Sequence, residues 1–91
     1  MTITDTDTFE QAGNISSTDI PDGLAVSDMD GKEVHFLNPV ASAVFLLCDG
    51  AHDARAIAAI LAEEYGLSEP PLQDVVNCLA ELQSFGIIRK T

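Results

Sequence analysis

Cationic side chains are scarce in this chain. Its 91 residues include 4 Lys and Arg against 15 Asp and Glu, which gives a formal net charge of -11 at pH 7. Proteins bind DNA and RNA mainly through Lys and Arg, which displace counterions from the phosphates, so the composition argues against a nucleic-acid partner. The negative charge either favours a partner with a basic patch or simply keeps a small protein in solution.

Membrane and export signals are also missing. The longest uncharged apolar run, residues 36–48, is interrupted by Asn38, Pro39 and Ser42 and is too short to cross a bilayer. No basic segment followed by an apolar stretch occurs at the N-terminus, so we expect no secretory signal. The sequence therefore predicts a cytoplasmic protein without a membrane partner.

The signatures of common catalytic sites are absent as well, including a Gly-rich phosphate loop, a nucleophile elbow and paired catalytic carboxylates. Cys48 and Cys78 each lie in an apolar helical pattern, which favours packing as reduced thiols, although Cys78 could lie beside a binding surface. His35 and His52 have no further ligand at metal spacing, and Asp49 is typical of a turn or helix cap. We predict no catalytic residue, no metal and no cofactor.

The length of the chain limits where a functional site can lie. A chain of 91 residues allows one domain, and a domain this small buries only about 60% of its unfolded surface. Its hydrophobic content of 46% suffices for a compact core. Because no deep active-site cavity is expected, function should lie on the surface.

The N-terminal residues predict a tail. Residues 1–13 are rich in Thr and Asp, and only Ile3 and Phe9 are spaced apolar residues. Such a composition rarely buries enough apolar surface to become ordered. We expect a flexible acidic tail over residues 1–13 and a folded domain over residues 14–91.

A small antiparallel sheet is expected next. Strand-like patterns occur at residues 14–18, 24–27 and 33–37, with turn signals at 20–23 and 28–31. In the third strand, Val34 and Phe36 share one face, and Glu33, His35 and Leu37 share the other. This alternation is typical of a hairpin with one side covered.

Three helices should follow the sheet. Asn38, followed by proline, can cap the first helix, and Gly50 can end it. Asp53 can cap a second helix that runs to Gly66, and a third covers residues 71–85. A hairpin followed by these helices predicts an α+β, winged-helix-like domain, with an N-terminal three-stranded antiparallel sheet and then three helices.

The third helix does not have the composition of a DNA reader. A recognition helix presents cationic or amide side chains to bases and phosphates. Residues 71–85 contain no Lys or Arg and do contain Asp74 and Glu81. The domain is therefore expected to bind something other than DNA.

Four segments within residues 20–90 resemble the PqqD family. They are Phe36-Leu37-Asn38-Pro39, Leu47-Cys48-Asp49-Gly50, residues 57–65 and residues 79–88. Small standalone members of this family and its fused homologues are RiPP recognition elements, which hold the leader of a ribosomally made precursor peptide for a modifying enzyme. The resemblance implies a non-catalytic protein that presents a leader peptide to a maturation enzyme such as a radical SAM enzyme, a cyclase or a leader peptidase.

The resemblance also implies a binding site. In that family the leader adds as a further strand to the edge of the third strand, and its side chains rest against the third helix. By position, the edge strand comprises Glu33, Val34, His35, Phe36 and Leu37. The groove wall comprises Leu72, Val76, Leu79 and Gln83. An open strand edge suits this role on physical grounds, because an extended peptide can satisfy its unpaired backbone groups.

A second hypothesis stays open at this point. The domain could instead be a winged-helix interaction or regulatory module that works without a precursor peptide. Such a module would dock on another protein or form a homodimer.

Overall fold

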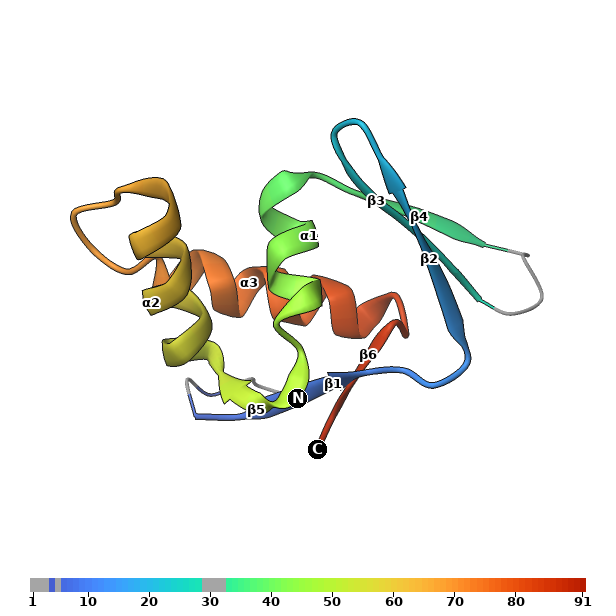
Figure 1. The fold of residues 1–91 in the computed structure, drawn as a ribbon. Coiled ribbons are helices and arrows are strands. Elements are labelled where there is room, and N and C mark those ends of the chain that lie inside the picture. Colours follow the sequence, from blue (N-terminus) through green and yellow to red (C-terminus); the bar gives the residue numbers. More distant parts are fainter. Residues whose placement is uncertain (1–3, 5, 29–32) are drawn as a thin grey trace.

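The computed structural model describes residues 4, 6–28 and 33–91, and Figure 1 shows two small sheets packed around three helices. The strands are β1 (Thr8–Gln11), β2 (Ile15–Ile20), β3 (Gly23–Asp28), β4 (Val34–Leu37), β5 (Asp49–Asp53) and β6 (Ile88–Lys90). The helices are α1 (Pro39–Leu46), α2 (Ala54–Tyr65) and α3 (Leu72–Ser84). The predicted α+β class is confirmed, with a three-stranded antiparallel sheet ahead of three helices.

That predicted sheet has the order β2-β3-β4. Its register places Thr18 opposite Ala25, and Ala25 opposite Phe36. The β2-β3 turn at residues 21–22 matches the expected turn. Of the turn expected at residues 28–31, positions 29–31 lie outside the described residues. The sheet ends at Leu37, one residue before the cap of α1.

Local signals set the helix ends. The Asn38 side chain accepts a hydrogen bond of 2.8 Å from the Ala41 backbone N–H, and Asp53 caps α2 in the same way through Ala56. Gly66 ends α2 with a φ of 64°, the left-handed conformation that glycine adopts without strain. These predicted caps are confirmed.

One predicted helix end is wrong. Gly50 does not terminate α1, because the helix stops at Leu46 with Leu47 as a right-handed cap. The chain enters β5 at Asp49, so Gly50 is a strand residue. The strand was not foreseen because its five residues, Asp49–Asp53, are mostly small or polar.

The expected flexible tail is also wrong for part of its length. Residues Thr8–Gln11 form β1, the central strand of a second sheet with the order β5-β1-β6. Phe9 is 1% exposed and belongs to the core. The Arg89 side chain donates to Glu10 at 2.7 Å, and the Lys90 ammonium lies 3.3 Å from Asp7. Two terminal segments therefore pair with each other, and the folded domain begins before residue 14.

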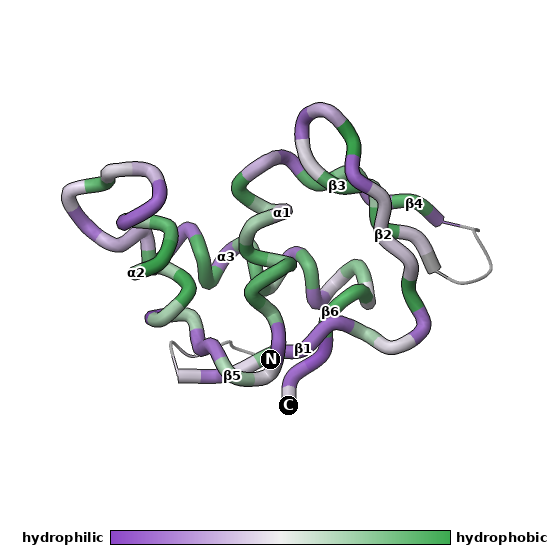
Figure 2. The backbone as a smooth tube through the Cα atoms, in the orientation of Figure 1, coloured by the Kyte–Doolittle hydropathy of each residue, from purple (hydrophilic) through white to green (hydrophobic). Residues whose placement is uncertain are grey.

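A single core joins both sheets and all three helices. Figure 2 shows that α1 is hydrophobic over most of its length, as expected for a helix between other elements. The largest fully buried side chains are Phe9, Phe45, Ile57, Leu79, Leu82, Val26, Val44, Val75 and Cys48. The core holds β4 and α3 in fixed positions, with a space between them.

Candidate functional site: a groove between β4 and α3

β4 has one open edge. Among the strands of the described residues, β3 alone pairs with it. A Cβ added to Gly23 would lie 1.8 Å from the Leu37 carbonyl oxygen, so this carbonyl points toward β3. Residues of an antiparallel strand direct their backbone groups alternately to the two edges. The backbone of His35 therefore faces β3, whereas Val34 and Phe36 direct their N–H and C=O groups to the open edge.

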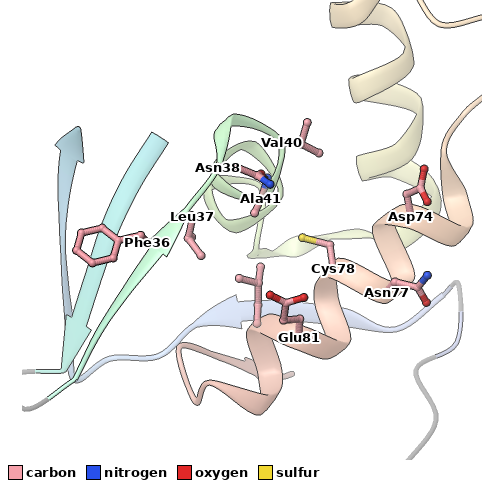
Figure 3. Close-up of a pocket in the computed structure, with 10 residues that line it drawn as sticks. Phe36, Leu37, Asn38, Val40, Ala41, Asp74, Asn77, Cys78 and Glu81 are labelled. Carbon is pink, nitrogen blue, oxygen red and sulfur yellow. The ribbon is translucent and has the colours of Figure 1, made fainter. Parts of the chain in front are cut away.

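A cavity of about 290 Å³ separates this strand from α3. Figure 3 shows its residues arriving from three elements: the end of β4, the first turn of α1 and one face of α3. They are Phe36, Leu37, Asn38, Val40, Ala41, Asp74, Asn77, Cys78, Glu81 and Leu82. An extended segment placed beside β4 would lie along this cavity, and its side chains would contact α3.

The far end of β4 is held against α3 by an aromatic pair. The His35 ring stacks on the Phe85 ring with centroids 4.3 Å apart and planes 12° apart. His35 Nε2 also lies 3.7 Å from the Glu33 carboxylate. His35 therefore faces the helices, as Leu37 does, and Val34 and Phe36 are the exposed side chains of the strand.

The four residues predicted for the groove wall do not line this cavity. Leu79 is 0% exposed in the core, and Leu72 borders a different hollow beside Arg55 and Pro70. Val76 and Gln83 are partly buried, and Val76 packs against the core. The apolar stripe of α3 is used for folding, so its binding role stays a prediction that the geometry does not favour.

Most of the α3 face that borders the cavity was missed in the sequence, which singled out only Cys78 as a residue that could lie beside a binding surface. Asp74, Asn77, Cys78 and Glu81 recur at intervals of three, one and three residues, which places them on one side of the helix. Polar residues at such spacing normally indicate a solvated face, so no signal in one sequence singles them out. Only the position of β4 turns this face into a groove wall.

A second, smaller cavity of about 200 Å³ lies on the other side of two residues that line the first. The two share Val40 and Asp74 as lining residues. The second cavity lies between α1, the end of α2 and the start of α3, where Tyr65 and Leu67 contribute partly exposed apolar side chains. The groove therefore has room for side chains beyond the length of β4.

Comparison with known proteins identifies the family of this chain. The family described as "Coenzyme PQQ synthesis protein D (PqqD)" matches residues 23–88, which cover most of the chain from β3 to the start of β6. The chain belongs to the PqqD family. The resemblance expected from the four sequence segments is thereby confirmed. No curated protein matches this PqqD-family chain significantly.

A solved structure shares the fold. It is described as "TbiB1 in Complex with the TbiA(beta) Leader Peptide", and it matches with a TM-score of 0.74 and 17% sequence identity. The match covers 88% of the present chain and 94% of that chain. The PqqD-type fold thus extends to a protein whose sequence is largely different, and the TbiB1 structure contains a leader peptide.

The two thiols of this PqqD-family chain are poor nucleophiles. Burial raises the pKa of Cys48 to about 12, with smaller contributions from Cys78 and Asp49. Its Sγ donates to the Val44 carbonyl at 3.2 Å, as a packed thiol does. Burial also raises the pKa of Cys78 to about 11, and the Glu81 carboxylate adds to this shift. Both thiols stay protonated near neutral pH, and thiolates are the reactive form.

The second histidine lies in β5. His52 Nδ1 lies 2.9 Å from Asp49 Oδ1, and the same oxygen accepts from the Ala51 backbone. The hydrogen bond from His52, followed by that from Ala51, lowers the pKa of the Asp49 carboxyl.

Within the part of the chain that the structure describes, no group of three or more His, Cys, Asp or Glu could hold a metal ion. No helix among the described residues is long and apolar enough to cross a membrane.

Proposed function

We propose that this protein binds the leader region of a ribosomally made precursor peptide and presents it to a maturation enzyme. The observation that carries the proposal is the open edge of β4, which faces the polar side of α3 across a cavity of about 290 Å³. Membership of the PqqD family and the shared fold with a leader-peptide complex support it.

Strand addition supplies both affinity and reversibility. The backbone groups of Val34 and Phe36 at the open edge are unpaired by any strand that the structure describes, and a peptide can bond to them whatever its side chains are. Each hydrogen bond contributes about 0.5–1.5 kcal/mol net, so four bonds and two apolar contacts reach roughly micromolar affinity after ordering costs. Such a complex can form and dissociate during one round of maturation.

The protein itself has a carrier role in this proposal. The maturation enzyme would be a radical SAM enzyme, a cyclase or a leader peptidase acting on the bound precursor. Protonated thiols with raised pKa values and a His52–Asp49 pair within β5 give the chain little means of catalysis. The protein works in the cytoplasm, where the precursor peptide is made, and needs no cofactor.

The test is a pair of substitutions at one edge residue. Phe36→Pro removes an N–H that points to the open edge, and proline is tolerated at edge positions whose N–H faces solvent. Phe36→Ala removes the same side chain and keeps the amide. We expect the cognate leader peptide to bind Phe36→Ala within about threefold of wild type and Phe36→Pro at least about tenfold more weakly, because the donor and the pairing geometry are both lost.

A third variant checks the assignment of the edge. His35→Pro removes an N–H directed at β3, so it should lower the unfolding midpoint, whereas Phe36→Pro should stay folded by circular dichroism. Titration by fluorescence anisotropy then compares the folded variants. If a folded Phe36→Pro variant binds the leader as tightly as Phe36→Ala, strand addition at β4 is the wrong mechanism.

An open edge can also pair with itself. Two copies joined through antiparallel β4 strands would form a continuous sheet, which is the alternative of an interaction module without a precursor peptide. Sedimentation at several protein concentrations distinguishes the leader-binding protein from the self-pairing module, because the homodimer would dissociate on dilution and on Phe36→Pro substitution. A dimer that excludes the leader would favour the alternative.

A further inference from the structure

The wall that α3 contributes to the groove carries two carboxylates. Asp74 and Glu81 line the cavity, with Asn77 and Cys78 between them on the same helix face (Figure 3). No Lys or Arg occurs among the lining residues that the structure describes. A segment that enters the groove therefore meets negative charge on the α3 side.

Neither carboxylate is neutralised by a cation of the described chain. Arg89 pairs with Glu10, and Lys90 pairs with Asp7, both at the second sheet. Among the described residues Asp74 and Glu81 take part in no ion pair. The charge of Glu81 also acts on the cavity itself, since it contributes to the raised pKa of Cys78. The groove therefore offers an incoming ligand two acceptors that have no ion-pair partner among the residues the structure describes.

The opposite side of the strand offers apolar contacts. Phe36 is 73% exposed and Val34 is 47% exposed, and both side chains project from the outer face of the sheet. In a peptide added as a strand beside β4, alternate residues would lie beside Val34 and Phe36, and the remaining residues would face α3. One face of the peptide therefore meets apolar side chains, and the other face meets carboxylates.

The spacing of the carboxylates limits the ligand further. Glu81 follows Asp74 by seven positions in α3, which corresponds to about 10.5 Å along a helix. Residues on one face of a strand recur about every 6.7 Å. Two long cationic side chains placed two or four residues apart in the ligand can reach both carboxylates.

We propose that the cognate peptide is a strand of alternating character, with Lys or Arg at two positions facing Asp74 and Glu81 and apolar residues at the intervening positions beside Val34 and Phe36. This inference rests on the proposed function and specifies its ligand. The net charge of -11 accelerates the encounter with such a basic segment at low salt.

The probe is a library of random twelve-residue peptides displayed on phage and selected against the wild-type protein. We expect the selected sequences to be enriched, relative to the unselected library, in Lys or Arg two or four positions apart, with apolar residues between them. The most enriched sequence is then synthesised, and its Kd is measured by fluorescence anisotropy in low and high NaCl. Added salt should weaken binding, because exposed ion pairs are screened.

A charge-neutral double variant isolates the carboxylates. Asp74→Asn combined with Glu81→Gln keeps the shape of both side chains and should raise the Kd about three- to tenfold, as expected for two exposed ion pairs. Glu63→Gln combined with Glu64→Gln is the matched control. It removes the same charge from an exposed part of α2 outside the groove, and should leave the Kd within about twofold.

The outcomes separate this inference from the function on which it rests. Selected peptides that lose affinity for Phe36→Pro but lack cationic residues, or whose Kd does not respond to the Asp74 and Glu81 double variant, overturn the charge pattern alone. Selected peptides that bind Phe36→Pro and Phe36→Ala equally overturn strand addition as well. A selection without any binder counts against both.

Discussion

Truncation of Phe9 would test the most unexpected part of the fold. This side chain lies in β1, between β5 and β6, and is 1% exposed. The substitution Phe9→Ala leaves the backbone of β1 able to pair and removes only the ring. Its effect therefore measures how firmly the N-terminal strand is packed on the core.

The expected loss is large for a domain of this size. Replacing a fully buried Phe with Ala typically costs about 3–5 kcal/mol through lost burial and the cavity left behind. A small domain has a total unfolding free energy of about 5–15 kcal/mol. Phe9→Ala should thus remove at least about a fifth of the unfolding free energy.

The chain provides its own control. Phe36 is the same residue type at 73% exposure, so Phe36→Ala should change the unfolding free energy by no more than about 0.5 kcal/mol. Urea unfolding followed by circular dichroism measures both variants. If Phe9→Ala unfolds within about 1 kcal/mol of Phe36→Ala, residues 8–11 are not docked in solution, and a mobile tail is the correct description.

Two further predictions concern the groove and its support. Bound peptide should protect Cys78 from iodoacetamide, because this thiol lines the cavity. Without peptide, the alkylation of Cys78 should accelerate as the pH approaches the thiol pKa of about 11. The more deeply buried Cys48 should stay unreactive in the folded protein. Equal labelling of Cys78 with and without peptide would place the peptide elsewhere. Gly23→Ala should destabilise the domain by about 2–4 kcal/mol, since its Cβ would overlap the Leu37 carbonyl at a φ of 147°; a thermally unchanged variant would contradict the described β3–β4 contact.

Local chemistry in the sequence sufficed for much of the fold. Asn38 and Asp53 cap helices, Gly66 ends one, and the alternation in residues 34–37 predicts a strand. Each of these signals acts on neighbours within four residues, so it can be read without knowing the rest of the molecule. The family and the edge position of residues 33–37 were instead expected from the resemblance of four sequence segments to the PqqD family.

The second sheet could not be predicted from such local signals. β1 offers a single buried apolar side chain, Phe9, and its partners are residues 49–53 and 88–90, far along the chain. Thr8 and Thr91 side chains hydrogen-bond to each other across the whole sequence. The local sequence of such a strand carries little strand signal, because pairing with distant partners, and not the β-propensity of its residues, determines its conformation.

The sequence by itself determined most of the helix limits, the early three-stranded sheet, the acidic charge and the family; the end of α1 was the exception. Tertiary structure alone decided which face of α3 borders the groove and which amides of β4 are open. The apolar stripe with Leu79 is drawn into the core because burial of hydrophobic surface dominates folding. This orientation of α3 places Asp74 and Glu81 along the cavity beside β4, so most of the cavity wall on α3 consists of residues that the core does not require.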